Sequence, residues 1–328
     1  MEQNLTTLTP QEKVRICETS CDEGPTHGIY MQKLSHKPVM LKEVLSMFNL
    51  KDGMVVVDAT MGLGGHSLSL AEKIVPKGKL IGIDKDAESL AVARGHLKKY
   101  SKNCLLVQDD FRNLDKVLDR SNIEGVDAIL FDLGISSFQL DNAVRGFSIR
   151  SEGPLDMRMD RKSFISAYDL LNNLTEEEIA SILWKFGQER FSRRIARSLV
   201  HARGKAPISS TKELAELIVK VLPIKARFQR IHPATRTFQA LRIAVNRELD
   251  ALDEALKKAA LYLNKKGRIC VISFHSLEDK IVKENFRAWA KAGKYRLVVK
   301  KILRPTPQEM DDNPRSRSAK MRVIERVR

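Results

Sequence analysis

Short apolar segments alternate with helical patterns through the first 140 residues. Strand-like segments occupy residues 54–57, 79–83, 104–107 and 126–131. Between them, the spacing of apolar residues predicts helices over 36–48, 67–74, 86–99 and 114–120. Such alternation is typical of a parallel sheet covered on both faces, so it predicts an α/β fold. A later segment, 268–273, predicts a fifth strand, and 295–303 and 321–327 are candidates for two more.

The chain between these two parts has a purely helical pattern. Residues 141–163 are polar and rich in turn formers, and helical spacing follows them to about residue 230. Thr175 and Glu178 form a capping-box pattern that opens a helix through Phe186. Further helices are predicted over 190–203, 211–222 and, as one long helix, 234–263. The helical block therefore reads as an insertion into the α/β domain.

These patterns predict four parts of the chain. They are a mobile tail (1–34), the first part of the core (35–140), an inserted helical domain (141–235) and the second part of the core (236–328).

A glycine-rich turn follows the first predicted strand. Residues 58–66 read Asp-Ala-Thr-Met-Gly-Leu-Gly-Gly-His, and glycines at such a turn let the backbone approach a ligand closely. Asp84 ends the second predicted strand, twenty residues after Gly64. An acidic side chain at that place suits hydrogen bonding to ribose hydroxyls, so the pair indicates a nucleoside-containing cofactor.

The details of the turn discriminate between cofactors. The third glycine of the dinucleotide fingerprint is missing, and no phosphate-binding lysine follows, which excludes a P-loop. Asp58 is awkward for a pyrophosphate but suits a cationic ligand. The pattern Asp-x-Thr-x-Gly-x-Gly-Gly resembles the first motif of S-adenosylmethionine-dependent methyltransferases. The alternative is a glycine turn that merely packs a strand on a helix.

The charge of the chain is unevenly distributed. The net charge is +16, of which residues 141–236 carry +7 and residues 291–328 carry +8. Segregated positive charge is typical of a protein that binds a polyanion such as nucleic acid, although a basic surface that only maintains solubility is the alternative.

The remaining composition argues against a membrane or secreted protein. No apolar stretch is long enough to span a bilayer, and the N-terminal segment is polar and acidic, so we expect a cytoplasmic protein. A zinc site built from Cys17, Cys21, His27 and His36 is conceivable, but their spacing fits no common zinc module, and we expect no metal.

Four further segments carry a specific resemblance. They are Asp132–Asp141, Arg145–Asp160, His232–Ala240 and Ile272–Asp279. With the glycine turn, they resemble the bacterial small-subunit ribosomal RNA cytosine-N4 methyltransferase family (MraW/RsmH type). One departure is Phe138, where that family usually has proline.

The resemblance implies a fold and a function. The fold is a Rossmann-like class I S-adenosylmethionine-dependent methyltransferase sheet with an inserted all-helical, substrate-recognition domain. The implied activity is methylation of the N4 amino group of a cytidine in small-subunit (16S) ribosomal RNA, near the decoding centre. The substrate could be the RNA or the assembled small subunit, and the protein could be a monomer or a homodimer.

The resemblance also assigns site residues. The positions that match the family's S-adenosylmethionine site are Gly64, Gly65, His66, Asp84, Phe111, Asp132 and Gln139. Asp84 would bind the ribose, Phe111 would pack on the adenine, and the backbone at 64–66 would contact the amino-acid part. Asp132 would position the cofactor and in part assist catalysis by accepting the amino hydrogens of cytosine. His66 could instead be a helix-start residue bonded locally.

A basic helix supplies the candidate RNA contacts. Arg190, Arg193, Arg194 and Arg197 could hold the RNA backbone, or could form an ordinary solvated helix face. Arg145–Asp160 is a candidate active-site loop, although structural ion pairs would explain Asp156, Arg158 and Asp160 equally well. Two other functions stay open: methylation of another RNA or of DNA, and RNA binding without catalysis by a relic cofactor fold.

Overall fold

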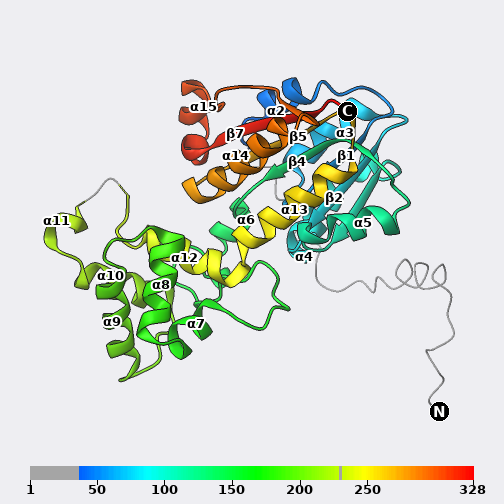
Figure 1. The fold of residues 1–328 in the computed structure, drawn as a ribbon. Coiled ribbons are helices and arrows are strands. Elements are labelled where there is room, and N and C mark those ends of the chain that lie inside the picture. Colours follow the sequence, from blue (N-terminus) through cyan, green and yellow to red (C-terminus); the bar gives the residue numbers. More distant parts are fainter. Residues whose placement is uncertain (1–36, 229–230) are drawn as a thin grey trace, which may run out of the picture. The chain divides into compact units, whose positions relative to one another are not determined.

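The computed structural model describes residues 37–228 and 231–328, and His36–Arg328 forms one compact unit. The predicted N-terminal tail and the conceivable zinc site at Cys17, Cys21, His27 and His36 lie outside the described residues. The rest of the chain builds a seven-stranded sheet and a group of helices that packs around its own core (Figure 1).

The sheet has the strand order β3-β2-β1-β4-β5-β7-β6. Its first five strands are parallel, and β7 runs antiparallel between β5 and β6. The strands are β1 (Val55–Asp58), β2 (Lys79–Asp84), β3 (Cys104–Gln108), β4 (Val126–Asp132), β5 (Leu263–Ser273), β6 (Tyr295–Leu297) and β7 (Lys320–Arg326). The α/β prediction is therefore confirmed. The strand predicted over 295–303 is shorter, because the chain leaves the sheet after Leu297 and returns only as a single bridge at Leu303.

Both faces of the sheet are covered by helices, as the sequence pattern predicts. Alternate residues along β1 point to opposite faces, so Val57 belongs to one buried apolar cluster and Val56 to another. The first cluster includes residues of α5 (Leu114–Arg120), α13 (Glu248–Tyr262) and α14 (Ser276–Lys291). The second includes residues of α2 (Leu41–Phe48), α3 (Gly65–Ile74) and α4 (Ala87–His96).

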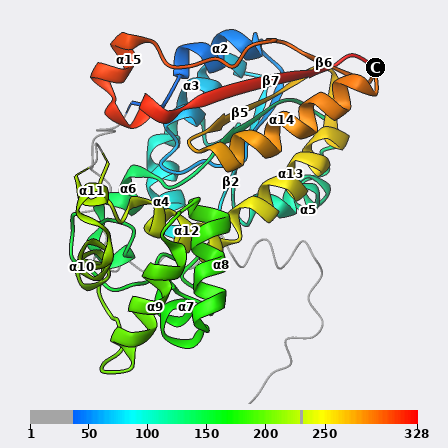
Figure 2. The ribbon, with the colours of Figure 1, turned by 60° about the vertical axis from the view of Figure 1, so that its left-hand side comes forward.

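A third apolar cluster lies within the helical part of the chain. Figure 2 shows the helices of this part gathered into one group. The helices are α7 (Ala167–Asn173), α8 (Glu176–Gly187), α9 (Ser192–Arg203), α10 (Thr211–Val221), α11 (Ile224–Arg227) and α12 (Thr235–Asn246). The predicted capping box is present: the Thr175 hydroxyl accepts from the Glu178 N–H, and the Glu178 carboxylate accepts from the Thr175 N–H. The division of the chain at residues 141 and 235 stays a prediction.

Short elements connect these layers. They are α6 (Ser137–Asp141), α15 (Pro307–Asp312) and the 3₁₀ turns η1 (Lys98–Tyr100), η2 (Phe111–Asn113), η3 (Ala143–Arg145) and η4 (Pro314–Ser318).

The single long helix expected from 234 to 263 is wrong. Arg247 adopts a left-handed conformation (φ 50°, ψ 41°) and separates α12 from α13. The two helices serve different cores, since α12 residues join the third cluster and α13 residues join the first. No glycine or proline marks this break, so packing against two separate cores overrides a continuous helical pattern.

Candidate active site

The carboxyl ends of the parallel strands carry the side chains that the sequence singles out. Asp58 ends β1, Asp84 ends β2, Asp132 ends β4, and Phe111 follows β3 in η2. Because β2 and β4 both pair with β1, the three aspartates stand on neighbouring strands. Ligands of open α/β sheets bind beyond this edge.

The glycine turn connects β1 to the start of α3. Gly62 (φ 52°) and Gly64 (φ 82°) have positive φ, which side chains rarely adopt. Packing also demands small residues here: a Cβ at Gly64 would lie 3.3 Å from that of Ala93, and one at Gly65 would lie 2.9 Å from Cγ of Pro38. The packing interpretation of Gly64 and Gly65 is therefore supported, and their contact with a cofactor stays a prediction.

Asp84 braces this turn. One carboxylate oxygen accepts the Gly62 N–H at 2.7 Å and the other accepts the Asp86 N–H at 2.8 Å. Burial raises the pKa of Asp84 to about 6. Each carboxylate oxygen keeps a second lone pair, so the side chain can still accept from hydroxyl groups such as those of a ribose.

Asp58 has a more buried setting than the sequence suggests. It is 1% exposed, and it accepts the Ser67 hydroxyl of α3 at 2.6 Å. Burial raises its pKa to about 6. The carboxyl therefore holds the start of α3 against β1, and a direct contact with a cationic ligand is not what its position supports.

His66 is a buried helix-start residue with a long-range bond rather than a local one. Its Nε2 lies 2.9 Å from the carbonyl oxygen of Val39. A carbonyl only accepts, so Nε2 carries the proton and Nδ1 presents a lone pair. Burial lowers the pKa of His66 to about 4, which keeps the ring neutral. Nδ1 lies 3.5 Å from Oδ2 of Asp132, so the ring links α3 to the end of β4.

Asp132 has an unsatisfied carboxyl group. Its N–H donates to the Thr60 hydroxyl at 2.6 Å, but its Oδ1 is buried without a hydrogen-bond partner among residues 37–228 and 231–328. Burial, and the nearby charges of Asp58 and Glu278, raise the pKa of Asp132 well above its usual range. The carboxyl therefore favours the protonated form, which suits the lone pair of His66 beside it.

Phe111 and Gln139 occupy different settings. The ring of Phe111 meets that of Phe131 edge-on, with centroids 5.9 Å apart, and Nζ of Lys85 lies 5.7 Å from its centroid. Gln139 is buried, and its side chain bonds the Ser136 N–H and Oδ2 of Asp86. Gln139 thus acts first as a link between α6 and α4, and its predicted contact with a cofactor stays a prediction.

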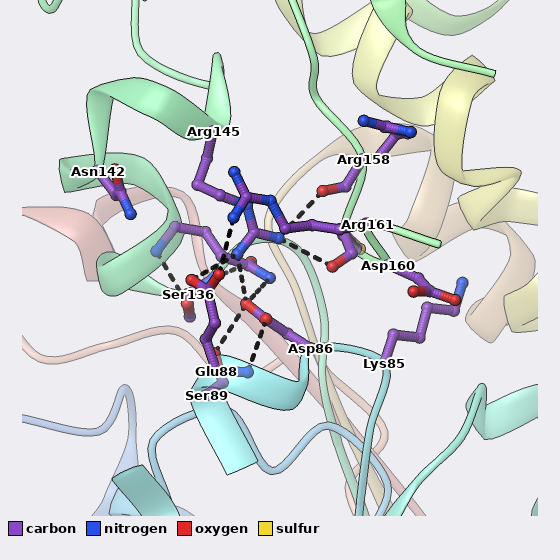
Figure 3. Close-up of polar contacts among 12 residues, drawn as sticks. Lys85, Asp86, Glu88, Ser89, Ser136, Asn142, Arg145, Arg158, Asp160 and Arg161 are labelled. Atoms are coloured by element: carbon purple, nitrogen blue, oxygen red, sulfur yellow. Dashed lines mark hydrogen bonds and ion pairs between the residues drawn. The ribbon is translucent and has the colours of Figure 1, made fainter. Parts of the chain in front are cut away.

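A buried arginine gathers the residues around Asp86 (Figure 3). Arg145 is fully buried, and its Nη1 lies 2.9 Å from Oδ2 of Asp86 and 3.4 Å from Oε2 of Glu88. Its Nη2 donates to the carbonyls of Arg158 and Met159. Asp156 and Arg158 form their own ion pair at 2.7 Å. The structural interpretation of Asp156 and Arg158 is supported, and the segment is tied to the start of α4.

A second charged group was not found from the sequence. Arg242 of α12 bonds both oxygens of Glu248, at 2.8 and 2.7 Å. His275 and Glu278 cap α14, with His275 Nε2 3.1 Å from Glu278 Oε1. Ligand atoms of Glu248, His275 and Glu278 lie within 4.8 Å of one another, a spacing that a metal ion could bridge. The Arg242–Glu248 pair joins α12 to the start of α13, and the His275–Glu278 pair caps α14. These residues are far apart in the sequence, so no short motif predicts that they lie together.

The four candidate RNA-binding arginines are exposed. Arg193, Arg194 and Arg197 lie on α9, and Arg190 just precedes it. Their spacing places them on one side of the helix. Arg197 pairs with Glu176 at 3.4 Å, and the other three arginines form no ion pair with a described residue.

In the described ranges, no helix is long and apolar enough to cross a membrane.

The Rossmann-like sheet and the match to a methylase family model identify the chain as an S-adenosylmethionine-dependent methyltransferase. S-adenosylmethionine is the cofactor of this class, as the glycine turn predicts. The chain belongs to the MraW methylase family, whose family model matches residues 33–327.

Individual relatives agree with this assignment. "Ribosomal RNA small subunit methyltransferase H" of Clostridium botulinum (strain 657 / Type Ba4) is 45% identical over 90% of this chain and 100% of its own length. The protein of the same name from Halothermothrix orenii is 44% identical over 90% of this chain and 99% of its own. Among solved structures, an rRNA methylase from Streptococcus thermophilus is 14% identical with a TM-score of 0.41, covering 88% of this chain and 92% of that one. The family resemblance of the sequence is therefore confirmed.

Proposed function

We propose that this protein transfers the methyl group of S-adenosylmethionine to the N4 amino group of a cytidine in small-subunit (16S) ribosomal RNA, near the decoding centre. Relatives named for small-subunit ribosomal RNA methylation support the RNA. The observation that carries the chemistry is Asp132, whose buried oxygen has no described partner. The protein would act in the cytoplasm, on the RNA or on the assembled subunit.

The cofactor would lie along the ends of β1, β2 and β4. Asp84 would accept from the ribose hydroxyls, Phe111 would pack against the adenine, and the backbone at Gly64, Gly65 and His66 would face the amino-acid part. Gln139, which bonds Asp86, would supply a further contact with the cofactor. When bound, S-adenosylmethionine supplies an activated methyl group, so this chemistry requires no metal.

Asp132 would assist the attack by the amino nitrogen. The lone pair of cytosine N4 is delocalised into the ring, which makes this nitrogen a weak nucleophile. A carboxylate that accepts the amino hydrogens favours the pyramidal geometry that a nitrogen needs as it gains a methyl group. The carboxyl of Asp132 favours a proton in the protein alone, and a positive charge placed beside it favours ionisation. Asp132 would therefore become a hydrogen-bond acceptor when the positively charged cofactor is bound beside it.

The basic residues would hold the RNA backbone while the base is turned into the site. The region 141–235, proposed as the substrate-recognition domain, carries part of the excess charge, and Arg190, Arg193, Arg194 and Arg197 line one side of α9. Phosphate contacts give affinity without sequence preference. The target base must leave its stack to reach the sheet edge.

Mapping of methylated cytidines tests the proposal. Small ribosomal subunits from cells that lack the protein should lose one N4-methyl mark, and the purified protein with labelled S-adenosylmethionine should restore it. A normal modification pattern in those cells would overturn the ribosomal substrate. Absence of S-adenosylmethionine binding in equilibrium dialysis would instead favour the relic-fold alternative.

Charge reversal on α9 tests the RNA surface. Changing Arg193 and Arg194 to glutamate should weaken RNA binding and lower the slope of log affinity against log salt, by roughly one unit per lost phosphate contact. The measurement is a filter-binding titration at several salt concentrations. Lys98→Glu with Lys99→Glu is the control, because these are also adjacent exposed cations. Equal losses in both variants would show a general charge effect.

A further inference from the structure

Arg242 holds its guanidinium in a fixed orientation. Nε and Nη2 donate to the two oxygens of Glu248, and the arginine side chain is 15% exposed. A planar fork bound in this way has little freedom to rotate. Nη1 is left over: it makes no hydrogen bond with any of the residues the structure describes. Nη1 is thus a charged donor that is held in place and has no acceptor within 37–228 and 231–328.

The free nitrogen faces the loop that follows Asp132. A Cβ built on Gly134 would lie 4.0 Å from Nη1 of Arg242 and 3.8 Å from the ring of Phe274. Gly134 has φ 101°, so other residues would be strained there. Arg242 and Phe274 therefore lie beside Gly134, which is two residues after Asp132 at the end of β4.

Glu278 connects Arg242 and Asp132 electrostatically. Its side chain is 3% exposed. Its charge raises the pKa of Asp132 and also that of the Arg242 guanidinium. One buried carboxylate thus acts on both groups, as expected if both face one small region at the ends of β4 and β5.

The arginine also accounts for the acidic group around it. Glu248, His275 and Glu278 have the spacing of a cation site, but both oxygens of Glu248 already accept from Arg242. Glu278 accepts the N–H groups of Phe274 and His275 at 2.8 and 3.2 Å. The guanidinium therefore fills the role of the cation, and its third nitrogen projects away from Glu248.

Asp132 and Arg242 together offer an acceptor and a donor to one ligand. The pairing edge of cytosine presents an amino donor at N4 and acceptors at N3 and O2. Uracil presents an acceptor at position 4 and a donor at N3, the reverse order. We propose that Arg242 is a specificity-determining residue, which donates from Nη1 to N3 of the target cytosine while Asp132 accepts from N4. This inference rests on the proposed function and names the group that rejects uridine.

Kinetics of Arg242→Gln provide the first test. With small subunits from cells that lack the protein, kcat/KM should fall about 10- to 100-fold, because a charged hydrogen bond to the base is lost. The dissociation constant of S-adenosylmethionine should change less than about twofold, since Arg242 lies outside the proposed cofactor contacts. Arg247→Gln is the control, because Arg247 is exposed and, among the described residues, forms an ion pair with Asp250 alone. Arg242→Lys should recover part of the activity.

Discrimination against uridine separates recognition from a merely structural role. Subunits with uridine at the target position should compete more weakly against the wild-type protein than subunits with cytidine. Arg242→Gln should reduce that ratio severalfold, and Arg247→Gln should leave it unchanged. An unchanged ratio in Arg242→Gln would overturn the inference even if activity falls, and so would wild-type kcat/KM in that variant. If the wild-type protein methylates no cytidine N4, the proposed function fails together with the inference.

Discussion

Two groups of charged side chains at the same edge of the sheet differ in how fully they are paired. Beyond β2, Asp84 and Asp86 accept from the turn, from α4, from Gln139 and from Arg145. Beyond β4, Asp132 keeps a buried oxygen without a described partner, and Arg242 keeps an unused nitrogen.

The difference separates two tasks. The carboxylates of Asp84 and Asp86 are bonded on several sides, although Nε of Arg145 is buried without a hydrogen-bond partner among the described residues. Such a network fixes the backbone before any ligand arrives, which suits the proposed cofactor end. A buried polar group without a partner lowers stability, so its retention is typical of a functional site. The Asp132 carboxyl, at the proposed methyl-acceptor end, is such a group. Four substitutions test this difference between the two ends of the site.

The largest effect is expected from Arg145→Met. Removal of one partner of a buried ion pair leaves Asp86 uncompensated, which should lower the free energy of unfolding by about 3–5 kcal/mol. Chemical denaturation measures the loss. Arg161→Met is the control: Arg161 pairs with Glu88 but is 48% exposed, so its loss should stay within about 1 kcal/mol. Similar values for both variants would contradict a structural role for the buried network.

Asp132→Asn should affect turnover rather than folding. An amide keeps the shape but is a weaker acceptor, so kcat should fall roughly 100- to 1,000-fold. Affinity for S-adenosylmethionine, measured by calorimetry, should stay within a few fold. Stability should hold or rise, because a buried carboxyl is removed. Asp253→Asn is the control, because Asp253 of α13 is a partly exposed aspartate that pairs with Lys257. A large loss of cofactor affinity with normal kcat would assign Asp132 to binding alone.

Asp58 should make stability depend on pH. Its pKa is about 6 in the folded protein and about 3.8 when unfolded, so the folded state binds its proton more tightly. The stabilising effect is complete below about pH 3.8 and is lost as the pH rises through 6, up to about 3 kcal/mol. Denaturation from pH 4 to 7 should show the wild-type protein losing stability relative to Asp58→Asn. A difference that does not vary with pH would contradict the raised pKa. Glu124→Gln, at an exposed position, should show none of this dependence.

Asp84→Ala should have the smallest effect. Loss of the ribose acceptor should weaken S-adenosylmethionine binding by ~1–3 kcal/mol. Calorimetry measures this, with Asp52→Ala as an exposed acidic control. Unchanged affinity would mean that the end of β2 only supports the glycine turn.

Local patterns predicted most of the fold. The strands, the glycine turn and the Thr175 capping box depend on neighbouring residues, so they can be read from spacing alone. The break at Arg247 depends on which core each helix meets, and no nearby residue signals it. The α/β sheet therefore followed from the sequence, whereas the division of one helix into two did not.

The candidate site was predictable only in part. Asp84 and Asp132 stand at strand ends, a position that alternation of strands and helices already implies. The partners that decide their chemistry come from far along the chain: Arg145 reaches Asp86 across 59 positions, and Gln139 reaches it across 53. The burial of Asp58 was also not apparent, because it depends on the packing of α3, whose Ser67 hydroxyl donates to this carboxylate.

The antiparallel strand β7 has a consequence for synthesis of the protein. It lies between β5 and β6, although residues 274–319 separate it from the end of β5. A ribosome therefore makes the apolar strand β5 well before the neighbour that covers its open edge. An unpaired apolar edge invites pairing with other chains. The growing chain is therefore exposed to aggregation in the interval between the synthesis of β5 and that of β7.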